Sequence, residues 1–304
     1  MTTPLTNPMT TSMTTPMTKT INHAGVSGGK DSVGLMLWMI HESGYDPDTL
    51  RFSMADTGNE AAETYEYVQM LHCKVHPIHI IKPPLDFYEL AEKKGRFPSP
   101  KARFCTQDLK MKPTKAYLDA LMAEGYTVIN HSGVRASESA DRAKLEEREP
   151  AWVSYFGCES YRPLLRWTLA DVWAIHARYG VPANPLYAKG CSRVGCLPCV
   201  MSRKSEIALI ARQFPERIDR IRECETAALS NRRGGSTFFA PAMVPLRYRT
   251  GNIYENKYGK GVKLTMIDDV VCWAKEGTSA ITGILDYGEM EEPPTCDSRS
   301  GLCE

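Results

Sequence analysis

The sequence has almost no net charge, no long apolar run and no internal repeat in its folded part. Its 304 residues carry a formal charge of +1, so bulk electrostatics do not indicate a nucleic-acid partner. No stretch approaches the about 20 apolar residues that cross a bilayer, which predicts a protein without a membrane anchor. Hydrophobic residues make up 42% and charged residues 24% of the chain, a balance that favours a globular fold.

A secretory signal is also missing, although the chain has ten cysteines. Disulfide frameworks are typical of secreted domains, whereas cysteines in a reducing compartment serve metal or redox chemistry. We therefore predict a cytoplasmic protein. Its first twenty residues (1–20) are rich in Thr, Met and Pro and have neither a helical period nor a core face, so we expect a disordered tail.

Residues 21–200 alternate between short apolar runs and amphipathic segments, and we expect them to form one domain. Strands are predicted at 22–26, 50–56, 75–81, 126–134 and 161–167, and helices at 31–41, 61–72, 86–95, 112–125 and 169–180. Alternation of this kind indicates the α/β class, with a doubly wound parallel sheet and helices on both faces. Thr168 and Asp171 resemble a capping box at the start of the last helix.

Beyond residue 200 the sequence predicts helices and loops in place of alternating strands and helices. Residues 201–290 are predicted to be a helical, cysteine-rich C-terminal extension, with helices at 205–214, 215–229 and 265–277. Thr265 is the expected N-cap of the last helix. Residues 231–263 are rich in Gly, Arg, Lys and Tyr and are expected to be a flexible loop, and residues 291–304 a flexible tail that contains cysteine.

A polar turn follows the first predicted strand. It reads Ser27, Gly28, Gly29, Lys30, Asp31 and Ser32. Glycine lets backbone N–H groups crowd around an anion, and the following helix directs its free N–H groups and positive dipole end to the same point. The lysine adds a charge and the serines add hydroxyl donors. The pattern differs from the Walker loop, yet it predicts a phosphate-binding turn. The alternative is a glycine-rich turn without a ligand.

Two further polar segments follow predicted strands. The carboxylate in "ADTGNE" can accept a hydrogen bond from a ribose hydroxyl or an adenine amine, although such a turn also caps helices. The two arginines in "GVRASESADR" can bind phosphate or sulfate in bidentate fashion, or can belong to a solvated loop. Because ligands of open parallel sheets bind beyond the carboxyl ends of the strands, we expect all three segments to share one ligand. The candidate residues here are Asp56, Thr57, Gly58, Gly133, Arg135 and Arg142.

Three cysteines are closely spaced in "GCSRVGCLPCVMS": Cys191, Cys196 and Cys199. Thiolates at C-x-x-C spacing reach one metal, and a fourth ligand is then needed. Four thiolates suit a [4Fe–4S] cluster or structural zinc, and spacing alone does not separate the two. We favour the cluster; buried free cysteines are the alternative. Cys73, Cys158, Cys224 and Cys272 are interpreted as core thiols.

In order along the chain, SGGKDS, DTGNE, "RFCTQDLKMKP", GVRASESADR and "PLLRWTLADVWAIHARYGVPANPLYAKG" resemble the motifs of the phosphoadenosine phosphosulfate (PAPS) reductase family. That family belongs to the PP-loop, or adenine nucleotide alpha-hydrolase, superfamily. The resemblance covers about two thirds of the chain. It implies an adenosine nucleotide as substrate (PAPS, APS or ATP, with Mg²⁺ as an accompanying ion). Residues 27–32 would face its phosphate end, Asp56 its nucleoside, and Arg135 and Arg142 its anionic end.

The resemblance also implies roles for cysteines. The family places a cysteine beside the nucleotide site, which makes Cys105 the fourth metal ligand; Phe104-Cys105 replaces the Cys-Cys pair of the APS-reducing branch, and Cys191 can make up the difference. Sulfonucleotide reductases attack the substrate's sulfur with a cysteine on a mobile C-terminal segment, and thioredoxin clears the S-sulfonated enzyme. Cys303 lies in that region, although the family's Glu-Cys-Gly-x-His signature is absent. A tail cysteine without a catalytic role is the alternative.

These observations favour a sulfonucleotide reductase that releases sulfite, with Cys303 as nucleophile. One alternative is an ATP pyrophosphatase that adenylates a nucleobase or nucleic acid for sulfur transfer, and another is a non-catalytic nucleotide-binding iron–sulfur module. Basic, Tyr-bearing stretches such as "RYRTGNIYENKYGKG" can contact a polynucleotide or form a solvated flap. The expected partners are the adenosine nucleotide, a thioredoxin-like reductant and further copies of the chain in a homo-oligomer.

Overall fold

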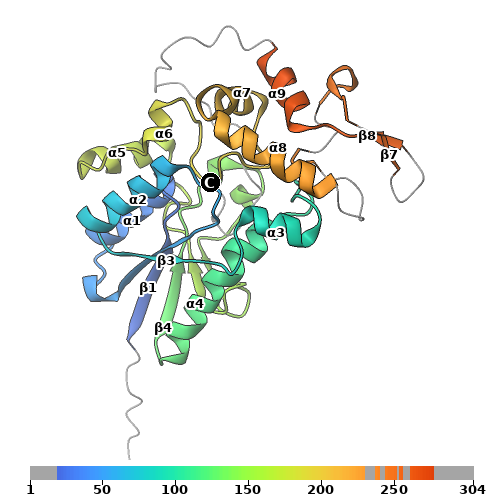
Figure 1. Cartoon of the computed structure of the whole chain (residues 1–304). Coiled ribbons are helices and arrows are strands. Elements are labelled where there is room, and N and C mark those ends of the chain that lie inside the picture. Colours follow the sequence, from blue (N-terminus) through green and yellow to red (C-terminus); the bar gives the residue numbers. More distant parts are fainter. Residues whose placement is uncertain (1–18, 230–236, 240–243, 252, 256–260, 277–304) are drawn as a thin grey trace, which may run out of the picture.

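The computed structural model describes residues 19–229, 237–239, 244–251, 253–255 and 261–276 (Figure 1). Its centre is a six-stranded sheet of order β3-β2-β1-β4-β6-β5, in which only β5 runs antiparallel to its neighbour. The strands are β1 Thr20–Gly25, β2 Leu50–Ala55, β3 Ile78–Ile81, β4 Thr127–His131, β5 Arg148–Glu149 and β6 Glu159–Tyr161. The chain extends the sheet from β1 to one side and then returns to the other side at β4. The carboxyl ends of β1 and β4 therefore form the topological switch point.

Helices cover both faces of this sheet (Figure 1). On one face, side chains of α1, α2 and α5 pack against β1, β2 and β3 in a single apolar cluster. On the other face, Leu118 of α4 packs with Ile21 and Val128. These helices are α1 Lys30–His41, α2 Ala62–Lys74, α4 Lys112–Ala123 and α5 Leu169–Arg178. The predicted α/β class with a doubly wound sheet is confirmed.

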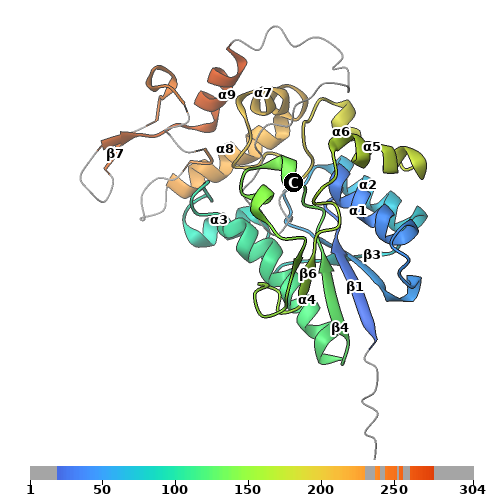
Figure 2. The ribbon, with the colours of Figure 1, turned by 180° about the vertical axis from the view of Figure 1, so that it is seen from behind.

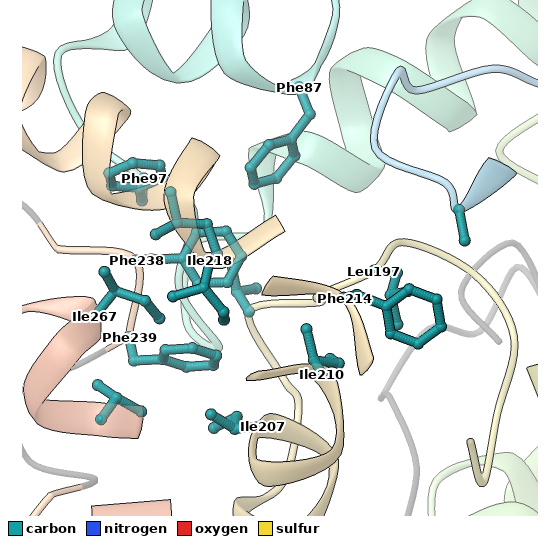
Figure 3. Close-up of a cluster of buried hydrophobic side chains, with 14 of the residues drawn as sticks. Phe87, Phe97, Leu197, Ile207, Ile210, Phe214, Ile218, Phe238, Phe239 and Ile267 are labelled. Atoms are coloured by element: carbon teal, nitrogen blue, oxygen red, sulfur yellow. The ribbon is translucent and has the colours of Figure 1, made fainter. Parts of the chain in front are cut away.

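A second group of helices lies beyond the carboxyl ends of the strands, as the two opposite views show (Figures 1 and 2). It comprises α3 Phe87–Lys94, α6 Pro185–Ala188, α7 Lys204–Gln213, α8 Pro215–Leu229 and α9 Ile267–Lys275. Their apolar side chains share one cluster, in which Phe238 and Phe239 lie between Phe87 and Ile207 (Figure 3). The segment that holds the three closely spaced cysteines, residues 191–199, is called the cysteine segment below. Its Leu197 belongs to the same cluster. The helical extension is therefore packed onto the part of the chain that carries the candidate site.

Several predictions made from the sequence are wrong in detail. Residues 162–167 form turns, not strand, because the carbonyls of Arg162 and Leu164 accept local hydrogen bonds from Leu165 and Trp167. Met266, not Thr265, caps α9; the Thr265 hydroxyl is buried without a hydrogen-bond partner. Where residues 231–263 are described, they include the antiparallel strands β7 Ile253–Glu255 and β8 Gly261–Lys263; the flexibility of this loop stays a prediction. Cys73 and Cys272 are exposed rather than in the core.

Other segments were missed or lie outside the description. The sequence did not reveal the short strand β5, the π-helical turn at Thr106–Met111 or helix α6. The predicted tail at 1–20 is described only at its end, where Thr20 already belongs to β1. The tail at 291–304, with Cys303, lies outside the described residues. Within the described ranges, no helix has the length and apolar character needed to cross a membrane.

The centre of the sheet contains polar side chains that bond to one another. Between β2 and β4, the His23 ring donates from Nδ1 to Asn130 Oδ1 and accepts at Nε2 from Ser53 Oγ, both at 2.8 Å. His131 Nε2 accepts from the Tyr45 hydroxyl at 3.0 Å. Burial lowers the pKa of both His23 and His131 from 6.5 to about 4. The folded protein therefore keeps both rings neutral where an unfolded chain would protonate them.

We predict that the protein loses stability as the pH falls from about 6.5 to 4, by at most ~3 kcal/mol for each histidine. The unfolded state binds more protons in this window, so the free energy of unfolding decreases with decreasing pH; above about pH 7.5 it does not depend on these rings. Urea unfolding at several pH values measures the slope. His23→Gln should reduce the slope, and the same change at exposed His41 should not. A flat profile in the wild type would contradict the prediction.

Candidate functional site

The predicted phosphate-binding turn lies at the switch point, between β1 and α1. Gly28 has φ +82° and lies close to α2: a Cβ there would be 3.1 Å from Thr64 Cγ2. Inside the turn, the Ser32 hydroxyl donates to the Gly29 carbonyl at 3.0 Å and accepts from the Ser27 amide at 3.2 Å. The two serines therefore bond within the turn and fix its shape.

Asp31 carries the strongest electrostatic interactions of this turn. Its carboxylate is 1% exposed and lies 2.9 Å from Lys30 Nζ and 2.5 Å from Arg135 Nε. Burial disfavours the charge of Asp31, but the Lys30 and Arg135 cations outweigh burial and hold the pKa of this carboxyl below its ordinary value. Asp31 therefore fixes the two cations that were predicted to meet the anion; its carboxylate is directed at those cations and buried.

The loop after β4 comes into direct contact with the turn. A Cβ on Gly133 would lie 2.9 Å from the Asp31 carbonyl, so only glycine permits this approach. Arg142, also predicted to bind the anion, is 1% exposed and forms an ion pair with Glu138. The Glu138 carboxylate also accepts from the Arg135 amide at 2.7 Å. Of the two predicted arginines, the structure therefore brings Arg135 to the turn and places Arg142 in the wall behind it.

The segment after β2 forms a network around a buried carboxylate. Glu60 accepts from the Thr57 hydroxyl at 2.8 Å and from the Tyr65 hydroxyl at 3.3 Å. Asp56 accepts from the same tyrosine at 2.6 Å and from the Gly58 amide at 3.0 Å. Burial and the neighbouring Glu60 and Asp56 raise the pKa of the Tyr65 phenol. Asp56 is half-buried, which leaves part of its side chain accessible at the edge of the sheet.

The cysteine segment pairs with this network. The Leu197 amide donates to the Asn59 carbonyl at 2.8 Å, and the Asn59 side chain donates to the Pro198 carbonyl at 3.0 Å. These bonds bring Cys196 Sγ to 3.6 Å from the Thr57 hydroxyl and 3.8 Å from Glu60 Oε1. The contacts of Asn59 therefore hold the segment after β2 (residues 56–60) next to the C-x-x-C pair.

Three of the four candidate cysteines, Cys105, Cys191 and Cys199, belong to one apolar cluster or pack against it. Cys196 and Cys199 are electrostatic neighbours, and burial raises the pKa of the Cys196 thiol while Lys110 opposes the rise. Cys105 begins the π-helical turn that carries Lys110, and it packs against the same apolar cluster as Cys199.

Cys191 has other neighbours. Burial, followed by Glu206 and Glu63, raises the pKa of its thiol to about 12. Within the described ranges, no three His, Cys, Asp or Glu side chains gather as metal ligands. The residues present thus form a neighbouring thiol pair rather than an assembled four-thiol site.

Sequence analysis missed the side chains that hold the turn from behind. On α6, the Tyr187 hydroxyl accepts from the Lys30 amide at 3.0 Å. At the N-cap of α6, the Asn184 amide donates to the Gly28 carbonyl at 3.3 Å. On α5, His176 Nε2 lies 2.8 Å from the Lys30 carbonyl. The string "PANPLYAKG" was noted only as part of a resemblance; its Asn-Pro start, typical of a capped helix, was the available signal.

We predict that Asp31→Asn lowers the free energy of unfolding by about 3–5 kcal/mol, because it removes the charge of the buried carboxylate that both Lys30 and Arg135 contact. Denaturant unfolding near neutral pH measures the loss. The matched control is Asp119→Asn, which removes a partly exposed ion pair with Lys115 and should change stability by less than about 0.5 kcal/mol. Equal losses in the free energy of unfolding would show that the buried contacts of Asp31 with Lys30 and Arg135 stabilise the protein no more than an exposed ion pair does.

Comparison with known proteins shows which family the chain belongs to. Residues 22–202 match the model of the phosphoadenosine phosphosulfate reductase domain. An uncharacterized 37.8 kDa protein of Escherichia phage 186 is 38% identical over 276 residues, which cover 75% of this chain and 81% of that protein. An adenosine 5'-phosphosulfate reductase of Allochromatium vinosum is 31% identical over 160 residues, which cover 49% of this chain and 58% of the reductase.

Among solved structures, a phosphate complex of PAPS reductase from Candida auris aligns with a TM-score of 0.45 and 22% identity, over 58% of this chain and 80% of that one. The family model, in contrast, covers more than half of the chain by sequence. Its range includes the turn at 27–32, the segments at 56–60 and 133–142, and the three clustered cysteines. The chain belongs to the phosphoadenosine phosphosulfate reductase family of the PP-loop superfamily.

Proposed function

We propose that the protein is an enzyme that binds an adenosine nucleotide at residues 27–32 and reduces a sulfonucleotide, APS or PAPS, to sulfite. One observation supports the proposal: the glycine-rich turn at residues 27–32, the cations Lys30 and Arg135, and the Cys196–Cys199 thiols converge at the carboxyl edge of one sheet. The names of the reductases similar to this chain support the same substrate class. Because the chain spans little more than half of the APS reductase, the reaction itself is part of the proposal.

The turn suits a phosphate or sulfate group. The start of α1 provides a positive dipole end, and Lys30 and Arg135 both lie at the turn in contact with Asp31. An arriving oxyanion would share both cations with that carboxylate. Asp56, half-buried beside the turn, is the proposed partner of the nucleoside, as an acceptor for a ribose hydroxyl or an adenine amine.

The sulfur chemistry in this proposal uses the Cys303 thiolate as nucleophile. A bond forms between Cys303 sulfur and the substrate's sulfur while the bond from that sulfur to the phosphate oxygen breaks, which releases the adenosine phosphate. A dithiol reductant of the thioredoxin class then attacks the Cys303 sulfur. Sulfite leaves with the electron pair, and the second thiol of the reductant resolves the mixed disulfide. The protein's own residues hold the leaving phosphate at the turn.

A metal centre at Cys105, Cys196 and Cys199 is part of the proposal, as a [4Fe–4S] cluster or zinc. Thiolates are suitable ligands for either centre, and binding would reverse the raised pKa of the Cys196 thiol. Charges of Glu206, Glu63 and Lys189 act on the pKa of the Cys191 thiol, whereas Cys196 and Cys199 act on one another, so we assign the fourth position to another donor. No step of the proposed reaction is routed through this centre.

The first test compares wild type, Lys30→Ala and Cys303→Ser, each supplied with APS, PAPS or ATP and Mg²⁺, together with thioredoxin. Wild type should bind a sulfonucleotide and release sulfite. Lys30→Ala should bind roughly tenfold to hundredfold more weakly, because it removes a charged contact to the oxyanion. Cys303→Ser should bind normally and release no sulfite. Calorimetry measures binding, and a sulfite assay measures turnover.

The outcomes separate the proposed reaction from its alternatives. Pyrophosphate release from ATP without sulfite from APS or PAPS would indicate an ATP pyrophosphatase. Nucleotide binding without any turnover would indicate a binding module. Equal affinity of wild type and Lys30→Ala for every adenosine phosphate would contradict the site itself.

For the metal centre, we expect anaerobically purified wild type to contain metal and Cys196→Ser to lose it. Cys191→Ser is the matched variant: it removes a thiol from the same motif, and the metal content should stay within about twofold of wild type because Cys191 is outside the proposed ligand set. Iron, zinc and sulfide analysis measures the content and identifies the centre. Equal loss in both variants would return Cys191 to the ligand set.

A further inference from the structure

The two oxygens of the Asp56 carboxylate have different surroundings. Oδ1 accepts a hydrogen bond from the Tyr65 hydroxyl at 2.6 Å and another from the Gly58 amide at 3.0 Å. Oδ2 has no hydrogen-bond partner among the residues that the structure describes, and the side chain is only half-buried. Because a carboxylate oxygen accepts about two hydrogen bonds, Oδ1 is filled by the protein and Oδ2 is open to a donor from outside it.

Tyr65 is held in a way that makes it a reliable donor. Its ring packs against the apolar cluster beneath α2, and its hydroxyl also lies 3.3 Å from Glu60 Oε2. Burial, together with the nearby Glu60 and Asp56 carboxylates, raises the pKa of the phenol, so the hydroxyl keeps its hydrogen. The shorter distance indicates that this hydrogen is donated to Asp56, and Glu60 has the Thr57 hydroxyl and amide as its other donors.

The first turn of α2 connects this carboxylate with the phosphate-binding turn. Thr64, the neighbour of Tyr65, lies so close to Gly28 that a Cβ there would be 3.1 Å from its methyl carbon. The Asn184 amide donates both to the Thr64 hydroxyl at 3.4 Å and to the Gly28 carbonyl at 3.3 Å. Helix α2 therefore contacts the phosphate-binding turn through Thr64 and Asp56 through Tyr65, which fixes the two positions relative to one another.

We propose that Tyr65 is a positioning residue for the nucleoside: it fixes Oδ1 of Asp56 to the protein, so that Oδ2 accepts a hydrogen bond from one nucleoside donor, an amino group or a ribose hydroxyl. The inference rests on the proposed function, because it concerns the same site. It adds a rule of specificity. A nucleotide that lacks this donor leaves Oδ2 without a partner when it binds, and an acceptor left unpaired in a site weakens binding.

The test compares AMP, the nucleotide that APS reduction would release, with analogues that each lack one donor. Purine riboside 5'-phosphate lacks the amino group, and 2'-deoxy-AMP and 3'-deoxy-AMP each lack one ribose hydroxyl. Calorimetry measures the affinity of wild type for all four. One analogue should bind roughly tenfold to hundredfold more weakly than AMP, and it identifies the donor that Asp56 accepts from. Equal affinity for all four nucleotides would overturn the inference.

Tyr65→Phe keeps the ring and removes only the hydroxyl. The preference for AMP over the identified analogue should shrink by about three- to tenfold, because the Asp56 carboxylate can then turn. Tyr67→Phe is the matched control: it lies on the same helix, and its hydroxyl donates to the Pro182 carbonyl, also at 2.6 Å. Both variants should show a similar small decrease in melting temperature, but Tyr67→Phe should keep the full preference. A full preference in Tyr65→Phe would show that its hydroxyl does not position the carboxylate.

Asp56→Asn provides a second test in which Tyr65 is unchanged. The Tyr65 hydroxyl and the Gly58 amide are both donors, so they should hold the oxygen of the new side chain and place its NH₂ group where Oδ2 was. A donor would then face the nucleoside donor, and the preference for AMP should be lost or reversed. An unchanged preference would contradict the inference while leaving nucleotide binding intact. Failure of wild type to bind AMP at all would instead overturn the proposed function, and the inference with it.

Discussion

The buried carboxylate of Asp31 is the interaction on which the candidate site depends. Two cations that lie a few ångströms apart and away from water repel one another, and a shared carboxylate between them removes most of that penalty. Lys30 adjoins Asp31 in sequence, but Arg135 is 104 residues further along. Their common partner therefore joins the loop after β1 to the loop after β4. The approach is so close that Gly133 has no room for a side chain.

A second set of contacts connects the cysteine segment with the nucleotide segment. Asn59 exchanges hydrogen bonds with Leu197 and Pro198 through its carbonyl and its side chain. From the helical extension, Arg217 donates to the Glu60 carbonyl at 2.5 Å. Movement of the C-x-x-C pair would therefore disturb the turn after β2.

The sequence was sufficient for the fold class and for the meeting of three polar segments at one edge of the sheet, because both depend on local signals. Strand-to-helix alternation shows in apolar periodicity, and a glycine-rich turn between a strand and a helix has few uses. The sequence did not show which residues of a motif would be directed at a ligand and which at the protein itself. SGGKDS reads as six equal ligands, but Asp31 is directed inward by a partner that lies far away in sequence. Similarly, C-x4-C-x2-C reads as three equal thiols, but the folded chain gives them different surroundings: burial and then Glu206 raise the pKa of Cys191, whereas Cys196 and Cys199 act on one another.

Several polar groups of the turn at residues 27–32 already have partners within the protein. Asn184 bonds the Gly28 carbonyl, Tyr187 the Lys30 amide and His176 the Lys30 carbonyl, and all three come from the segment that contains α5 and α6. A glycine-rich loop without such partners would have to be ordered by its ligand, which weakens binding by the entropy lost on ordering. Here folding has already ordered it. In the proposed function, the free energy gained from the oxyanion would therefore contribute to affinity and orientation rather than to ordering the loop. The segment with α5 and α6 carries none of the sequence-predicted ligands, yet it fixes the shape of the turn.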